Sequence, residues 1–153
     1  MKKLLIVSTS TVHGKPYLSY ITAEMARFFE GCRKIAFVPY ARPGGISHDE
    51  YTAKAASVFN ELGIALKGVH TFESPEAAVS WADGFFTGGG NTFVLLNALY
   101  ETGLIKTMKA AVEAGKPYMG TSAGSNITGV SVRTTNDMPI VYPPSFKAME
   151  LVP

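Results

Sequence analysis

The sequence predicts a doubly wound α/β fold, in which helices cover both faces of a mostly parallel sheet. Five short apolar runs recur along the chain, and stretches with a helical spacing of apolar residues separate them. The runs are continuously apolar rather than alternating, which is typical of parallel strands buried on both faces. The 153 residues suit one domain, expected over 1–153, and no repeat or linker divides them.

The first expected elements are a strand, a helix and a second strand. LLIV at 4–7 forms the first strand. A helix is predicted over 17–30 because one face carries five apolar residues: Leu18, Ile21, Met25, Phe28 and Phe29. IAFV at 35–38 forms the second strand, and a loop rich in Gly and Pro follows at 41–50.

The next helix is expected to begin at Ser47, with Glu50 completing a capping box. Its apolar stripe consists of Tyr51, Ala55, Val58, Phe59 and Leu62, and a third strand is expected at 64–69. Ser74 and Pro75 have the order typical of a helix start. The remaining elements are expected as helix, strand, helix, helix and strand at 75–81, 84–87, 92–100, 102–114 and 117–121.

Composition excludes several classes of protein. The 14 Lys and Arg residues are dispersed and the net charge is +2, so no nucleic-acid-binding surface is indicated. No apolar stretch approaches the length of a membrane span, and a cytoplasmic protein is expected. The one cysteine, Cys32, excludes an intrachain disulfide and a cysteine-based zinc site. It is expected to be a small, buried or half-buried residue.

Two glycine-rich turns are expected where ligands bind in such sheets, beyond the carboxyl ends of strands. The first, here called the elbow, is Gly-Thr-Ser-Ala-Gly at 120–124. Glycines two residues before and after Ser122 allow a sharp strand-to-helix turn that presents its hydroxyl. The Ala123 N–H is then placed to bind an oxyanion. The alternative is a structural turn without chemistry.

The second turn, here called the glycine turn, is Gly-Gly-Gly-Asn at 88–91. Glycines let backbone N–H groups approach a substrate carbonyl, so it is interpreted as an oxyanion loop. A phosphate cradle or a plain tight turn are the alternatives. The turn does not continue as G-x-G-x-x-G, and the chain contains no Walker pattern, which makes phosphate binding the weaker interpretation.

A nucleophilic serine needs a general base. The histidines, His13, His48 and His70, all precede Ser122. His13 follows the first strand and is the one most readily placed at the same sheet edge. His48 begins a helix and His70 follows the third strand. Each is also interpretable as an ordinary surface or loop imidazole.

Four motifs, taken together, resemble the peptidase E family of α-aspartyl dipeptidases. They are DEYTAK, GGGNTF, GTSAGSN and RTTNDMPI, in this order over nearly the whole chain. The resemblance implies a three-layer sandwich of the flavodoxin-like or class I glutamine amidotransferase-like type. It further implies a cytoplasmic serine peptidase that cleaves Asp-X dipeptides without metal or cofactor. A non-catalytic domain that binds a small anion or an acidic amino acid, a cyanophycinase-like hydrolase and an assembly fragment are the alternatives.

The resemblance also implies roles for individual residues. Ser122 matches the nucleophile, and the N–H groups of Gly90 and Ala123 match the oxyanion hole. Asp137 matches an acidic residue near the active site. Arg133 is a candidate for binding the substrate carboxylate, because guanidinium binds carboxylates bidentately, or else a solvated arginine. Asn91 is a second candidate for substrate binding.

Members of the family extend beyond the length of this chain, and their catalytic histidine and third triad acid lie in that extension. The chain is therefore expected to be the leading, C-terminally incomplete portion of such a peptidase, and to hydrolyse Asp-X dipeptides poorly by itself. An uncovered sheet edge is expected to favour self-association.

Overall fold

A computed structural model describes residues 1–153, and it confirms the predicted α/β class. Five strands and eight helical segments follow one another along the chain. The strands are β1 (Leu4–Val7), β2 (Lys34–Val38), β3 (Ala65–Gly68), β4 (Gly84–Thr87) and β5 (Tyr118–Thr121). The α-helices are α1 (Thr22–Phe28), α2 (His48–Glu61), α3 (Pro75–Trp81), α4 (Thr92–Thr102), α5 (Leu104–Glu113) and α6 (Ala123–Asn126). Two 3-10 turns are η1 (Ser19–Ile21) and η2 (Val69–Thr71).

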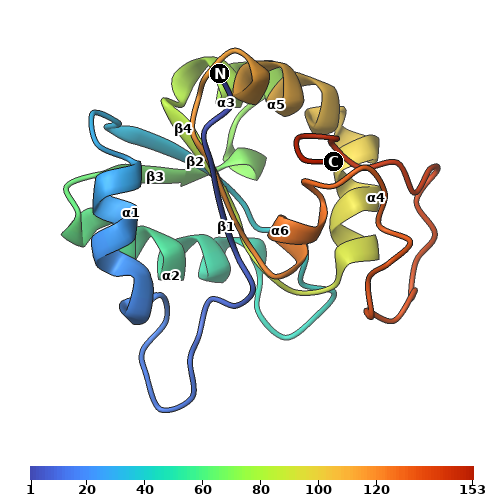
Figure 1. Ribbon diagram of the computed structural model, residues 1–153, viewed down its shortest axis with the longest axis horizontal. Coiled ribbons are helices and arrows are strands. Elements are labelled where there is room, and N and C mark those ends of the chain that lie inside the picture. The colour runs from blue at the N-terminus through green and yellow to red at the C-terminus, as the bar shows by residue number, and fades with distance from the viewer.

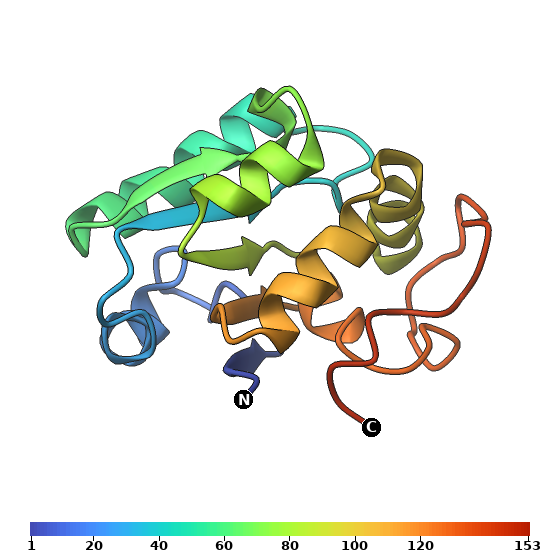
Figure 2. The ribbon, with the colours of Figure 1, turned by 90° about the horizontal axis from the view of Figure 1, so that it is seen from above.

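All strands are parallel and lie in the order β1-β5-β4-β2-β3. The register aligns the strand ends: Thr87 lies opposite Val38 on one side and Gly120 on the other, and Val7 lies opposite Thr121. The segments that follow β1, β5, β4 and β2 therefore leave the sheet at one edge. Figure 2 shows α4 beyond the tip of the β4 arrow, at this edge.

Helices cover both faces of the sheet, which makes three layers. Helices α1 and α2 lie on one side, and α3 and α5 lie on the other (Figure 1). Alternate residues of a strand enter different cores: Phe37 packs with α1 and α2, whereas Ala36 packs with α3, α4 and α5. This burial on both faces is the reason that the strands are continuously apolar.

Local signals predicted several boundaries well. Ser47 caps α2 by accepting from the Glu50 N–H, although the Glu50 side chain makes no return bond. Ser74 caps α3 with Pro75 as its first residue. Asn91 caps α4, accepting from the N–H groups of Phe93 and Val94.

Two expectations about the first elements were wrong. The helix predicted over 17–30 is only Thr22–Phe28, preceded by η1, because Leu18 adopts a φ of 58° that no α-helix accommodates. Strand β1 is not fully buried, because it lies at the edge of the sheet, where Ile6 is 42% exposed.

After α6 the chain packs back beside α4 and α6 without forming a further strand or helix. Backbone hydrogen bonds join residues 148–152 to residues 127–130, and Leu151 is buried in the core with α5. The two termini lie on the same side of the molecule (Figure 2), where Lys2 Nζ donates to the Leu151 carbonyl at 2.7 Å.

Candidate active site

Ser122 occupies a sharp turn between β5 and α6. Its φ of 51° and ψ of −111° lie in a region that L-amino acids rarely adopt, and it is half-buried at the sheet edge. Its N–H donates to the Val7 carbonyl of the neighbouring β1 at 3.1 Å. A strained serine at the end of a parallel strand is the geometry of a nucleophile elbow.

Both glycines of the elbow are required by backbone crowding. A Cβ added to Gly120 would overlap the Gly124 carbonyl, lying 2.6 Å from its carbon. A Cβ added to Gly124 would overlap the Thr87 carbonyl of β4, lying 2.8 Å from its carbon. Two further hydrogen-bond contacts, one buried and one partly buried, hold the turn in place. Tyr118 Oη donates to the Gly124 carbonyl at 2.6 Å, and Ser125 Oγ lies 2.6 Å from the Val7 carbonyl oxygen.

The glycine turn lies directly against Ser122. A Cβ added to Gly89 would be 3.0 Å from Ser122 Cβ and 3.6 Å from Ser122 Oγ. Gly90 has a φ of 144°, and a Cβ there would be 2.7 Å from the Ala41 carbonyl carbon, so only glycine fits. The structure therefore brings together the two turns that the sequence singled out.

Two backbone N–H groups beside Ser122 are free to bind a ligand. The Gly90 N–H has no hydrogen-bond acceptor in the chain, whereas those of Gly88 and Asn91 donate to Val38 and Ala41 carbonyls. Ala123 is the first residue of α6, so its N–H has no intrahelical acceptor. They are the two N–H groups for which the sequence predicts the role of oxyanion donor.

Asp137 and Asn91 meet at the start of α4. Asp137 Oδ2 accepts from the Thr92 N–H at 2.8 Å and from the Thr92 hydroxyl. Asn91 Nδ2 donates to the Met138 carbonyl at 2.7 Å, while its oxygen caps the helix. The Asn91 side chain is thus engaged in holding the segment 137–138. Asp137 Oδ1 accepts no hydrogen bond from the chain.

Arg133 lies apart from the two turns. Its guanidinium is 6.0 Å from the centroid of the Phe146 ring. It shares a surface hollow of about 290 Å³ with six residues, none of which belongs to the elbow or the glycine turn: Val130, Ser131, Ser145, Phe146, Lys147 and Glu150.

No histidine hydrogen-bonds to Ser122, whose hydroxyl makes no hydrogen bond within the chain. His70 Nε2 lies 2.7 Å from Asp49 Oδ1, and the His48 ring packs edge-on against His70. Burial, and next the neighbouring His70, lower the pKa of His48. His13 is exposed in the segment after β1. Cys32 is half-buried as expected, and burial raises the pKa of its thiol.

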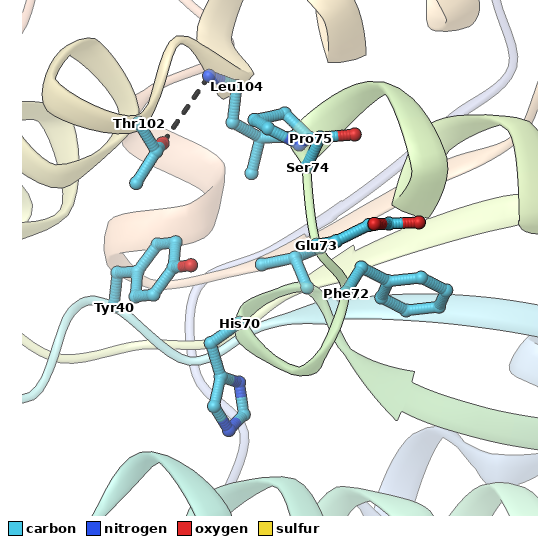
Figure 3. A pocket seen from close by; sticks show the side chains of 9 residues that line it. Tyr40, His70, Phe72, Glu73, Ser74, Pro75, Thr102 and Leu104 are labelled. Atoms are coloured by element: carbon cyan, nitrogen blue, oxygen red, sulfur yellow. Dashed lines mark hydrogen bonds between the residues drawn. The ribbon is translucent and has the colours of Figure 1, made fainter.

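The pocket in Figure 3 lies beside His70 rather than Ser122. Its volume is about 310 Å³, and its lining includes Tyr40, Phe72, Ser74 and Leu104. His70 follows strand β3, and strands β2 and β4 lie between β3 and β5 in the sheet. This pocket is therefore not the site built by the two turns.

Sequence reasoning missed Tyr51 as a part of the site. Its hydroxyl accepts from the Gly89 N–H at 2.9 Å and lies 3.3 Å from the Gly89 carbonyl oxygen. Tyr51 stood in the apolar stripe expected for α2, and that pattern reports burial but not what a hydroxyl contacts. The DEYTAK motif contains it, yet no spacing in the sequence relates it to the glycine turn.

Comparisons with known proteins agree with this geometry. Residues 4–153 match peptidase family S51. The chain is 48% identical over 150 residues to a peptidase E of Streptomyces coelicolor, covering 98% of this chain and 60% of that protein. It is 46% identical over 149 residues to a peptidase E of Shewanella denitrificans, covering 97% and 63%. The chain thus spans less than two thirds of the length of these relatives.

Solved structures show the same fold. A putative peptidase E of Listeria monocytogenes EGD-e superposes with a TM-score of 0.80 at 25% identity, covering 99% of this chain and 76% of that one. A peptidase of an acI-B1 actinobacterium superposes with a TM-score of 0.70 at 17% identity, covering 99% and 65%. None of the helices described above combines the length and hydrophobicity needed to cross a bilayer. With a family match over 4–153 and relatives near half identity, the chain belongs to peptidase family S51.

Proposed function

We propose that this chain carries the nucleophile and the oxyanion hole of a serine peptidase, with Ser122 as the nucleophile. The observation that carries the proposal is the contact between two turns: a strained serine lies against a glycine turn whose Gly90 N–H is unpaired. Membership of a serine-type peptidase family supports it.

The geometry supports a definite division of labour. Ser122 Oγ attacks the carbonyl carbon of the scissile bond, and the carbonyl oxygen gains negative charge. The N–H groups of Gly90 and Ala123 donate to that oxygen, which stabilises the transition state more than the bound substrate. Preorganised donors of this kind contribute about 100- to 1,000-fold each to the rate.

The reaction also needs a base that takes the Ser122 proton. None of the chain's histidines is bonded to Ser122, so we propose that these 153 residues alone hydrolyse dipeptides slowly, through the oxyanion hole and binding. Asp137 is proposed as an acidic residue of the site. Its free Oδ1 is available to accept from the N–H of an imidazole base, while Oδ2 stays fixed by Thr92.

The proposed substrates are dipeptides with an N-terminal aspartate, by analogy with the family. A cationic side chain is the group best suited to bind that carboxylate. Besides Arg133, the structure offers Arg42, which follows Ala41 and stacks 4.9 Å from the centroid of the Tyr51 ring. Arg42 forms no ion pair, and the carbonyl of the preceding residue, Ala41, accepts from the Asn91 N–H of the glycine turn at 2.7 Å. We therefore favour Arg42 over Arg133 as the carboxylate-binding residue.

Calorimetric titration with Asp-Leu and Asn-Leu tests this recognition without needing turnover. We expect the unsubstituted chain and Arg133→Ala to prefer Asp-Leu by about 10-fold or more, the value of a charged hydrogen bond. Arg42→Ala is expected to bind both dipeptides equally. If Arg133→Ala, and not Arg42→Ala, lost the preference for Asp-Leu, Arg133 would be the carboxylate-binding residue, as the sequence suggested.

Labelling with a fluorophosphonate tests the nucleophile. Labelling is expected to be slow, because no histidine of the chain hydrogen-bonds to Ser122. After prolonged incubation, mass spectrometry is expected to find the label on Ser122, and Ser122→Ala is expected to abolish it. Ser57→Ala, on the exposed side of α2, serves as the matched control. An unlabelled Ser122 combined with measurable binding of aspartate would favour the alternative, a domain that binds a small anion or acidic amino acid. Hydrolysis of cyanophycin but not of Asp-Leu would favour a cyanophycinase-like hydrolase.

We also propose that copies of the chain associate through β1, one of the two edge strands of the sheet. Ile6 is 42% exposed there. Size-exclusion chromatography with light scattering is expected to show association that Ile6→Lys reduces. A monomer at all concentrations would contradict this.

A further inference from the structure

We infer that Tyr51 is the positioning residue that sets the glycine turn against Ser122 and leaves the Gly90 N–H free. The inference rests on the function proposed above and extends it to a residue 38 positions away from the turn. Tyr51 touches neither the scissile bond nor the oxyanion, so its role is to place other groups.

The first argument is the pairing of the turn's N–H groups. Gly88 N–H donates to Val38 at 3.3 Å, Gly89 N–H to Tyr51 Oη at 2.9 Å, and Asn91 N–H to Ala41 at 2.7 Å. Only the Gly90 N–H has no acceptor. Two of the three paired N–H groups donate to backbone carbonyls, and Tyr51 is the only side chain that hydrogen-bonds to residues 88–90.

The second argument is close packing between Tyr51, the turn and the nucleophile. A Cβ on Gly88 would lie 2.6 Å from Tyr51 Cζ, and one on Gly89 would lie 3.0 Å from Ser122 Cβ. The turn is thus held between the tyrosine and the serine. A displacement of the Tyr51 hydroxyl would therefore be transmitted to the distance between Gly90 and Ser122.

The third argument is the rigidity of the Tyr51 ring. The side chain is 1% exposed and packs edge-on against Phe37, at a centroid distance of 5.0 Å. The Arg42 guanidinium stacks on the ring at 4.9 Å. A hydroxyl on an immobilised ring is a fixed reference point, which a preorganised oxyanion hole requires, because donors help only where the charge develops.

Tyr17 supplies a matched control. Its hydroxyl is also buried and lies near Tyr51: burial, and next the neighbouring Tyr51, raise its pKa. It makes no hydrogen bond with the glycine turn. Tyr51→Phe and Tyr17→Phe therefore each remove one buried hydroxyl from the same core, and only the first removes a contact with the glycine turn.

The test compares the two variants in the full chain at a temperature where circular dichroism shows both folded. We expect Tyr51→Phe to slow fluorophosphonate labelling of Ser122 by about 10-fold, less than the loss of a whole oxyanion donor. Affinity for Asp-Leu, measured by titration, is expected to stay within about 2-fold, since the ground state does not use the hole. Tyr17→Phe is expected to match the unsubstituted chain in both.

Hydrogen exchange of the Gly89 amide, followed by NMR, provides a readout independent of chemistry. Exchange is expected to accelerate in Tyr51→Phe and to stay unchanged in Tyr17→Phe. Equal labelling rates in the two variants would overturn the positioning role while the proposed function stands. Absence of labelling in the unsubstituted chain would overturn the proposed function instead. In that case, equal Gly89 exchange in the two variants would overturn the placement of the turn by Tyr51 as well.

Discussion

The elbow and the glycine turn are held by different kinds of contact. The glycines of the elbow, Gly120 and Gly124, are pressed against backbone, the carbonyls of Gly124 and Thr87. In the glycine turn, Gly88 and Gly89 are pressed against side chains, those of Tyr51 and Ser122, and only Gly90 is pressed against backbone, the Ala41 carbonyl. Backbone cannot yield without disturbing the sheet, whereas even a closely packed side chain can shift at a smaller cost in free energy. The position of the elbow is therefore set by the backbone of the sheet, whereas the position of the glycine turn depends largely on the side chains of Tyr51 and Ser122.

The largest expected effect comes from Gly124→Ala. The added Cβ meets the β4 backbone at Thr87, so strand and helix must separate. We expect a loss of about 4 kcal/mol in the free energy of unfolding, or no folded protein. Urea denaturation measures it. Gly44→Ala is the control, because no atom lies within 4 Å of its added Cβ. If the two variants had similar stabilities, the backbone around the elbow would not be rigid, and the contrast drawn between the elbow and the glycine turn would be wrong.

Gly88→Ala is expected to cost less, about 1–3 kcal/mol, because the obstacle is the Tyr51 side chain rather than backbone. The same denaturation experiment measures it. Tyr51 must shift against its packing on Phe37 and Arg42 to accept the methyl group, so labelling of Ser122 is expected to slow as in Tyr51→Phe. A cost equal to that of Gly124→Ala would show that Tyr51 is as immovable as the sheet.

Tyr118→Phe sharpens the comparison from the side of the elbow. The variant leaves the Gly124 carbonyl without its 2.6 Å donor in a fully buried site. We expect a loss of about 1–2 kcal/mol, the cost of an unsatisfied buried acceptor. Because backbone contacts also hold the elbow, labelling of Ser122 is expected to change less than in Tyr51→Phe. If labelling of Ser122 slowed more in Tyr118→Phe than in Tyr51→Phe, the elbow rather than the glycine turn would be the turn that depends on a side chain for its position.

The smallest expected effect concerns His48, at the start of the helix that carries Tyr51. Burial, and next the neighbouring His70, lower its pKa in the folded state, whereas Asp49 opposes this. The unfolded chain then binds more protons just below the ordinary histidine pKa of about 6.5. Stability should therefore fall as the pH is lowered through that window. His48→Gln is expected to reduce the fall, measured by urea midpoints at about pH 7.5 and 5.5. An unchanged pH dependence would assign it to other groups.

The sequence predictions were accurate where a structure depends on neighbouring residues and less accurate where it depends on residues far apart in the chain. Helix α3 and strand β4 agree with prediction to the residue, because Ser74, Pro75 and a compact apolar run are local signals. The helix over 17–30 was too long, because a periodic apolar face reports burial and not the positive φ of Leu18. Leu18, Ile21, Met25 and Phe29 are nevertheless buried as that face predicts.

For the candidate site, the sequence placed both glycine turns at the correct edge of the sheet. It could not identify Tyr51, which appeared only as one member of an apolar stripe. It offered Arg133 as one candidate beside the alternative of a solvated arginine, and it did not single out Arg42; Arg133 lies over Phe146 and Arg42 lies over Tyr51. Positions along the chain do not show which of several cations or hydroxyls reaches a given turn.

By itself, the sequence determined the α/β class, the approximate order of the elements and the position of Ser122 between two glycines. These features depend on periodicity and on steric limits that act over a few residues. Only the tertiary structure decided that β4 lies beside β5, that the Gly90 N–H is left unpaired and that the Tyr51 hydroxyl accepts a hydrogen bond from the Gly89 N–H. Those features depend on which distant segments pack together, and packing is a property of the whole folded chain.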